Sequence, residues 1–187
     1  VMRQPSSKCV RGITLIELVF TIATGSVLCA VSLPALGGLM QSGQSRSAHN
    51  ALVAALNLAR STAASRQADV SVCPSRDGTT CDNAIWWQRG WIVFADANRD
   101  GVRGPNEAII HVGQMHDGMA IASTAGRRHV IYRADGTSAG SNLTFTFCDR
   151  RGPASADTVV ISNTGRIRSG KATVSQAAAA CAGLAAP

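Results

Sequence analysis

Aromatic side chains and histidines are scarce in this sequence. The 187 residues include one Tyr, four Phe, three Trp and four His. No Ser/His/Asp or Cys/His spacing marks an activated nucleophile, and paired carboxylates are absent outside the segment Asp96–Asp100, so no enzymatic site is indicated. We expect the few aromatic side chains in the core, which leaves little surface for stacking on the bases of a nucleic acid.

Charge is almost absent from Ile13 to Met40, where Glu17 is the only charged side chain. As a helix, these 28 residues would be about 42 Å long. About 20 apolar residues suffice to cross a bilayer. A basic leader, residues 1–12, precedes the segment. We therefore predict a transmembrane or assembly helix over residues 13–40.

Beyond Met40 the hydrophobic pattern changes twice. Small apolar side chains recur at helical spacing up to about Gln67, which predicts an amphipathic continuation of the helix over residues 41–67. From residue 68 the period is two, as in Leu143–Phe147, and Gly-containing turns separate the strand-like runs. The predicted fold class is α+β: a long N-terminal helix packed on an antiparallel β-sheet head over residues 68–187, which ends in a loose Ala-rich tail.

Four of the six cysteines lie in the predicted head, and four cysteines allow three pairings. The most local pairing joins Cys73 to Cys81 across a short loop and Cys148 to Cys181, which would hold the C-terminal tail in place. Such disulfides would place the head outside the cytoplasm. The alternative is a zinc site, although the spacing contains no C-x2-C pair and no His lies close to the cysteines.

An acidic loop between two strand-like runs matches the EF-hand calcium pattern position by position. The flanking residues have strand rather than helix character, and Asp and Asn also form metal-free Asx-turns. Apart from this loop we expect no cofactor. Two interpretations stay open: a structural turn, or a calcium site formed by Asp96, Asn98, Asp100 and Glu107.

Basic residues outnumber acidic ones, and the net charge is +7. The excess is concentrated late: from Gly126 onward, eight basic residues stand against Asp135, Asp149 and Asp157. Such an asymmetry indicates either a polyanionic partner, such as nucleic acid, or simply a soluble basic domain.

Residues 11–18, RGITLIEL, resemble the class III prepilin signal, in which a basic leader ends in Gly and Glu is the fifth residue after it. The resemblance implies cleavage between Gly12 and Ile13 by a prepilin peptidase, then N-methylation of Ile13, although Phe is usual at that position. A carboxylate in an apolar helix needs a partner, and the N-terminal ammonium of a neighbouring subunit would pair with Glu17 during assembly. Pro34 is similar in placement to the helix-kinking proline of type IV pilins.

A secretory signal peptide and a plain signal anchor are the alternatives for the first 40 residues. A secretory signal would end in an A-x-A cleavage site, and no convincing one closes the apolar segment. A signal anchor explains the helix but gives no reason for the carboxylate of Glu17.

Three further segments resemble the GspH/FimT family of minor pilins and pseudopilins. They are residues 46–73, residues 90–100, and Ser162–Arg168, which is similar to the Gly-Arg-x-Arg motif of the FimT branch. The resemblance covers residues 11–169 and implies a type IV pilin-like fold. For the FimT branch it implies a minor pilin of the type IV pilus that binds DNA during natural transformation.

The residues of this motif fit DNA binding. Arg166 and Arg168 are two apart, so they lie on one face of a strand, and Gly165 can adopt the positive φ that ends a turn. Two guanidinium groups could hold successive phosphates of double-stranded DNA without reading its bases. Further basic residues that could extend this surface are Arg150, Arg151 and Lys171.

The resemblance also implies partners and a location. Prepilin peptidase would process the chain, which would span the inner membrane once with its head in the periplasm. The chain would then join other minor and major pilins in a cell-surface pilus or pseudopilus. Two alternatives remain open. One is a minor pilin that primes pilus assembly without binding DNA, and the other is a GspH-like pseudopilin of a type II secretion system.

Overall fold

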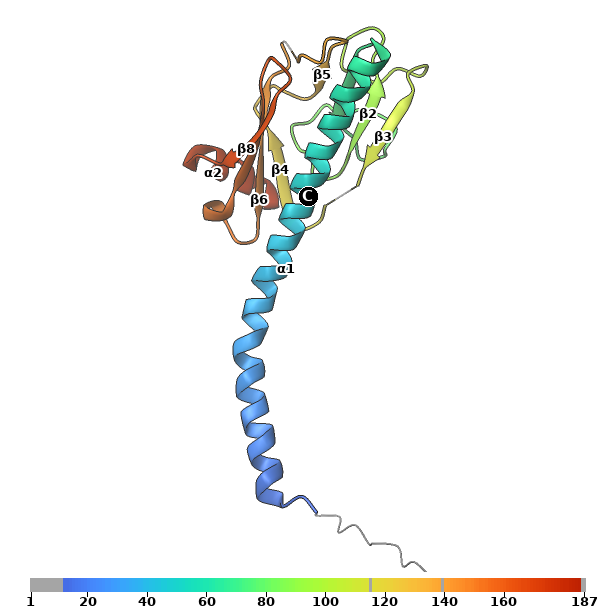
Figure 1. Ribbon diagram of the computed structural model, residues 1–187. Helices are drawn as coiled ribbons and strands as arrows, with labels where there is room; N and C mark the ends of the chain where they lie inside the picture. The colour runs from blue at the N-terminus through green and yellow to red at the C-terminus, as the bar shows by residue number, and fades with distance from the viewer. Residues whose placement is uncertain (1–11, 115, 139, 186–187) are drawn as a thin grey trace, which may run out of the picture. The chain divides into compact units, whose positions relative to one another are not determined.

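The computed structural model describes residues 12–114, 116–138 and 140–185, while the side chains of residues 31–36 lie outside the described part (Figure 1). The predicted kink at Pro34 falls within that segment and stays a prediction. The chain divides into two compact units, residues 1–39 and residues 40–187. Helix α1, Leu15–Arg66, contributes to both, which agrees with the long helix expected from the sequence.

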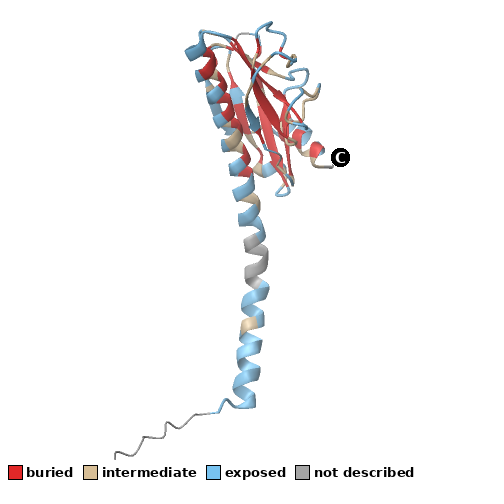
Figure 2. Cartoon of the chain, turned by 90° about the vertical axis from the view of Figure 1, so that its right-hand side faces the viewer, coloured by how far each residue is buried: buried red, intermediate tan, exposed pale blue. Residues whose placement is uncertain are grey.

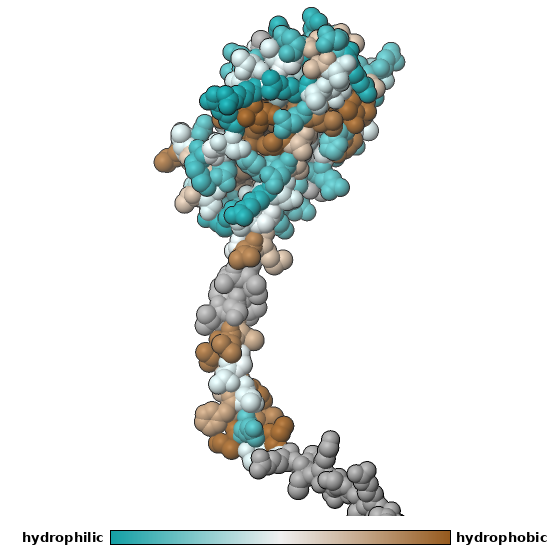
Figure 3. Space-filling model, in the orientation of Figure 1, coloured by the Kyte–Doolittle hydropathy of each residue, from teal (hydrophilic) through white to brown (hydrophobic). Residues whose placement is uncertain are grey.

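The first unit is an apolar helix with its side chains in the open (Figure 3). Its described large hydrophobic residues, in the ranges 13–30 and 37–39, are 51–81% exposed. Thr14 caps the helix, since its Oγ1 accepts the Glu17 N–H at 3.4 Å. Within the described ranges, no helix combines the length and the hydropathy that a membrane span requires.

In the second unit, α1 buries one face of small apolar side chains, as the helical spacing predicts (Figure 2). These residues are at most 2% exposed: Ala48, Leu52, Ala55, Leu56, Ala59 and Ala63. They belong to a single core cluster that also contains Val72, Trp87 and Phe145. The rings of Trp87 and Phe145 meet edge to face, with centroids 4.8 Å apart. One core therefore joins the helix to the whole β-structure.

The β-structure consists of two four-stranded antiparallel sheets rather than one simple meander. The first has the order β3-β2-β1-β5, with β3 Ile109–Gly113, β2 Trp91–Ala95, β1 Val70–Pro74 and β5 Val130–Tyr132. The second has the order β4-β6-β7-β8, with β4 Met119–Ser123, β6 Leu143–Asp149, β7 Asp157–Ile161 and β8 Ile167–Lys171. A short 3-10 turn, Pro153–Ser155, connects β6 to β7.

The C-terminal tail is helical, whereas we expected it to be loose. Helix α2, Val174–Ala182, starts with a capping box in which Thr173 and Gln176 exchange hydrogen bonds, and a 3-10 turn, Gly183–Ala185, follows it. Two buried alanines of α2 face the second sheet, where Ala180 packs with Ala122 and Cys148. The sequence concealed this helix because it has no charged residues and its buried positions are alanines in an Ala-rich segment.

Two disulfides are present, Cys73–Cys81 and Cys148–Cys181, which confirms the most local pairing. Their sequence separations are 8 and 33 residues. The first closes the loop after β1. The second ties α2 to the outer face of β6.

Removal of the longer-loop disulfide should cost more folding free energy than removal of the shorter one. The loop-entropy relation gives about 4 kcal/mol for Cys148→Ala/Cys181→Ala and about 2.5 kcal/mol for Cys73→Ala/Cys81→Ala. Urea unfolding of the full chain in a non-ionic detergent measures both. An equal loss, or a larger loss from Cys73→Ala/Cys81→Ala, would contradict the entropic account.

Candidate nucleic-acid interface

Arg166 and Arg168 lie at the start of β8, on the outward face of the second sheet. In the ladder, Arg168 is opposite Val160 and Ile167 is opposite Ile161, while the Ser162 N–H donates to the Arg166 carbonyl at 3.0 Å. The side chain of Ile167 packs against the core between them. Both arginines are exposed, and neither forms an ion pair in the part of the chain that the structure describes.

The turn before the two arginines requires a glycine. Gly165 has φ 72°, and its N–H donates to the Ser162 carbonyl at 2.8 Å. A Cβ on Gly165 would lie 2.1 Å from the Gly136 carbonyl oxygen, far inside van der Waals contact. The turn therefore sits directly on the loop that follows β5.

Arg60 of α1 connects the turn at Gly165 to the loop at Gly136 through hydrogen bonds. Its Nε donates to the Gly136 carbonyl at 3.0 Å, and its Nη2 donates to the Thr164 carbonyl at 3.3 Å. Ser138 adds two bonds: its N–H donates to the Asn163 carbonyl at 2.9 Å, and its Oγ donates to the Ser162 carbonyl at 2.8 Å. These hydrogen bonds fix the backbone of the turn that precedes Arg166.

Sequence reasoning missed Arg60 and Ser138, because each bonds across the fold to residues at the motif's turn. The one local signal was the position of Arg60, a cation at the border of the alanine face of α1.

The other basic candidates lie elsewhere and are mostly paired. Arg151 holds the buried Asp149 in a bidentate ion pair, with Nη2 to Oδ2 at 2.6 Å and Nε to Oδ1 at 3.0 Å. Burial alone would raise the pKa of Asp149, but the hydrogen bonds and charge of Arg151 bring that pKa below its ordinary value. Lys171 Nζ pairs with Asp157 at 2.7 Å, and Lys171 lies five positions, about 16 Å along the strand, from Arg166.

Arg150 is exposed and lines a separate cavity with Arg89 and His116. Arg127, which we did not predict as a site residue, lies across the second sheet from the pair. The Thr124 N–H donates to the Thr144 carbonyl, so Thr124, Thr144, Val160 and Arg168 form one row across the sheet. Arg127 follows this row at its other end and is exposed.

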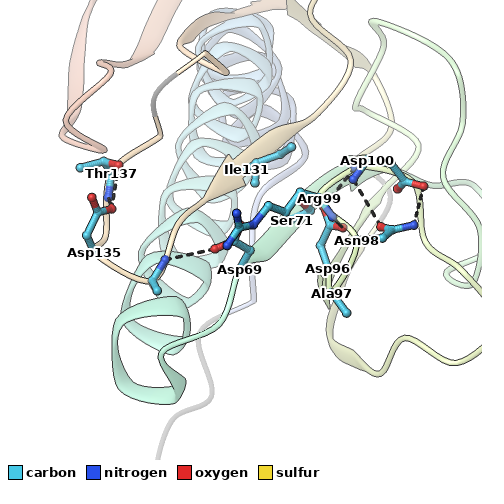
Figure 4. A network of polar contacts seen from close by, with 12 residues as sticks. Asp69, Ser71, Asp96, Ala97, Asn98, Arg99, Asp100, Ile131, Asp135 and Thr137 are labelled. Atoms are coloured by element: carbon cyan, nitrogen blue, oxygen red, sulfur yellow. Dashed lines mark hydrogen bonds and ion pairs between the residues drawn. The ribbon is translucent and has the colours of Figure 1, made fainter.

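The acidic loop after β2 is a tightly hydrogen-bonded turn (Figure 4). Asp96 is fully buried and accepts from the Arg99 N–H at 2.8 Å, the Gly101 N–H at 3.0 Å and the Ser71 hydroxyl at 2.5 Å. Glu107 accepts from the backbone N–H groups of Ala97 and Gly104 at 2.9 and 2.8 Å. Across the described ranges, no three His, Cys, Asp or Glu side chains are placed to hold a metal. The calcium site stays a prediction.

Arg99 extends this network. It adopts φ 65° and pairs through Nε with the buried carboxylate of Asp69 at 2.5 Å. The other oxygen of Asp69 accepts the Ala134 N–H at 3.2 Å. The network therefore joins the end of α1, the loop after β2 and the loop after β5, which carries Gly136.

We expect Asp96→Ala to destabilise the chain by about 2–4 kcal/mol, because two buried donors and one partly buried donor lose their acceptor. The exposed control Asp100→Ala should cost less than about 1 kcal/mol. Urea unfolding with and without calcium measures both effects. A melting temperature that rises with calcium would support the calcium site, because a ligand that binds the folded state stabilises it.

Gly165→Ala should cost about 3 kcal/mol of folding free energy, against about 1 kcal/mol for Gly126→Ala. Both glycines have nearly the same backbone conformation, with φ 72° and 78°. A side chain at position 126 meets nothing within 4 Å, so this variant reports the conformational cost alone. The additional loss of folding free energy at position 165 comes from the collision of the new Cβ with the Gly136 carbonyl oxygen. Equal losses in the two variants would show that the turn at Gly165 moves away from Gly136 easily.

A protein-family model described as Type II transport protein GspH matches residues 48–165. That segment exceeds half of the chain, and the chain therefore belongs to this family. The family assignment agrees with the resemblance drawn from the sequence. It identifies a pilin-like structural subunit, either a minor pilin of a type IV pilus or a minor pseudopilin of a type II secretion system.

The type IV minor pilin FimU of Pseudomonas aeruginosa has a similar structure in two crystal forms. Both are 22% identical to this chain, with TM-scores of 0.54 and 0.55; they cover 73% and 76% of this chain and 98% of FimU. This similarity confirms the pilin fold. The minor pseudopilin EpsH of Vibrio cholerae is 14% identical with a TM-score of 0.45, over 67% of this chain and 94% of EpsH. Comparison with curated protein sequences gives no match.

Proposed function

We propose that this protein is a minor pilin of a type IV pilus that binds double-stranded DNA non-specifically through Arg166 and Arg168, and so aids DNA uptake in natural transformation. The observation that carries the proposal is a pair of exposed guanidinium groups on one sheet face, without a carboxylate partner in the described parts of the chain. The turn that precedes them is held by Arg60, Gly136 and Ser138.

The chemistry of this surface suits phosphate groups. Each guanidinium fork donates two parallel hydrogen bonds to an anionic oxygen pair. The large aromatic side chains are buried, Trp87, Trp91, Tyr132, Phe94, Phe145 and Phe147 among them, so they offer no platform for unstacked bases. Contacts to the duplex backbone without base readout are the mode that this surface supports.

The proposal includes the processing steps that the N-terminal motif implies. Prepilin peptidase would cut between Gly12 and Ile13 and Ile13 would be methylated, after which Glu17 would pair with the ammonium of a neighbouring pilin. Thr14 precedes α1 as its cap, and Glu17 lies in the first turn, where its negative charge interacts favourably with the helix dipole. Before assembly, residues 13–40 would hold the chain in the inner membrane. The exposed apolar side chains of the first unit favour burial among other pilins.

Arg166→Gln/Arg168→Gln should weaken binding of a short labelled DNA duplex by roughly tenfold and lower the magnitude of the salt slope by about two, because two phosphate contacts are lost. Fluorescence anisotropy with the full chain in a non-ionic detergent measures both. Arg66→Gln/Arg76→Gln removes the same charge elsewhere and is the control. The basic leader is common to all variants and cancels in the comparison.

The outcomes separate the candidate functions. An equal loss in the two double variants would show a diffuse attraction and remove the assigned site. If the unmodified chain binds no duplex, the protein is a structural minor pilin that primes assembly, or a pseudopilin of a type II secretion system. Both alternatives are compatible with the family.

A further inference from the structure

Helix α1 and strand β8 lie side by side along the length of β8. At one end His49 Nε2 and Ser169 Oγ are 2.9 Å apart, and at the other Arg60 Nη2 donates to the Thr164 carbonyl at 3.3 Å. Residue numbers increase along the helix from His49 to Arg60, and they decrease along the neighbouring segment from Ser169 to Thr164. The two elements therefore run antiparallel. A cavity of about 480 Å³ opens between them at the His49 end. We call the groove between Arg46–Arg60 and Thr164–Lys171 the α1–β8 seam.

The helix side of the seam presents hydrogen-bond donors. Arg46, Asn50 and Asn57 are exposed, and their spacings of four and seven residues place them on one stripe of α1. Arg60 continues that stripe at the other end. Neither arginine forms an ion pair with a carboxylate among the residues that the structure describes. The positive charge of this stripe is therefore not neutralised within the second unit.

The strand side of the seam also presents donors, because β8 is the last strand of its sheet. The Ser162 N–H donates to the Arg166 carbonyl, and the Ala172 N–H donates to the Ala156 carbonyl. In an antiparallel ladder this alternation turns the backbone groups of the even-numbered residues of β8 toward β7. The N–H groups of Ile167, Ser169 and Lys171 consequently point to the open edge.

Among the described residues that line the cavity of the seam, Asp157 is the only acid, and it already has a partner. Asp157 lies beside Ser169 and Gly170 in the cavity, and its carboxylate pairs with Lys171 Nζ at 2.7 Å. His49 contributes a hydrogen-bonding ring rather than a full charge, because burial lowers its pKa although Asp157 acts against this. The seam therefore carries a net positive charge and presents many N–H donors.

We propose that the α1–β8 seam binds the sugar-phosphate backbone of one DNA strand, with Arg46 holding a phosphate at the end opposite to Arg166. This inference rests on the proposed function and extends its site from two arginines to a track. From Arg46 to Arg60 the helix rises about 21 Å, which corresponds to about six nucleotides at roughly 3.4 Å each along the duplex axis. Arg166 and Arg168 follow at the far end of the seam, on the outward face of the edge strand.

Arg46→Gln tests the track against a matched substitution on the same helix. Arg66 is also exposed and has the same charge, but the spacing of 20 residues places it on the opposite side of α1. Duplex binding by the full chain in a non-ionic detergent is followed by fluorescence anisotropy over a series of salt concentrations. Arg46→Gln should weaken binding about threefold to tenfold and lower the magnitude of the salt slope by about one, while Arg66→Gln leaves both unchanged.

Asn57→Asp provides a second variant, since it adds a negative charge at the middle of the stripe without touching an arginine. It should weaken binding at least as much as Arg46→Gln, and Asn83→Asp, on a distant loop, should not. Circular dichroism melts of all variants should superimpose, because the substituted side chains are not buried.

The result separates the track from the proposed site. If Arg166→Gln/Arg168→Gln weakens binding while Arg46→Gln behaves like Arg66→Gln, the track is overturned and the proposed site stands. If Arg46→Gln and Asn57→Asp weaken binding while Arg166→Gln/Arg168→Gln does not, the track stands and the assigned pair falls. A chain that binds no duplex at all overturns both.

Discussion

The second unit depends on the burial of one face of α1 against both sheets. Alanine occupies four of the six most buried helix positions, so the helix backbone can approach the strands closely. The six side chains share one cluster with residues from β1, β2, β4, β5, β6 and β7. Because the two sheets have no strand in common, this helix face is the element that sets their mutual position.

That close approach also explains how the arginine motif is oriented. Arg60 lies at the border of the buried face, near enough to the loops to donate to Gly136 and Thr164. A bulkier buried face would lift the helix and break both hydrogen bonds. The electrostatic surface at the start of β8 is thus a consequence of packing on the opposite side of the sheet. Gly165 completes the arrangement, since it leaves room for the Gly136 carbonyl.

Local patterns in the sequence predicted the elements better than their arrangement. The helical spacing from Ala48 to Ala63 and the alternation in Leu143–Phe147 both reflect a single periodic contact with the core, which a sequence displays directly. The pairing of β1 with β5 and the division into two sheets depend on contacts between distant segments, which leave no periodic signal. Helix α2 did have a local signal, the capping box of Thr173 and Gln176, but its alanine composition suggested a loose tail.

The candidate site shows the same division. The spacing of Arg166 and Arg168 indicated a shared face, because alternation along a strand is local. Which basic side chains are neutralised is not local: Arg151 and Lys171 contribute to the late positive charge, yet each is paired with an acid in the folded chain. A count of charges therefore overestimates the cationic surface, while the residues that support the motif cannot be counted at all before the fold is known.

The Cys148–Cys181 bond has a topological consequence for β8. Strands β7 and β8 lie between the two cysteines in the sequence, so the disulfide closes them into a covalent ring. An edge strand is the part of a sheet most prone to exchange with another molecule. Inside a closed ring β8 cannot leave as a free end, and exchange with a second copy would need either reduction or the passage of a whole loop. The oxidised state therefore keeps the edge strand of the sheet with its own chain.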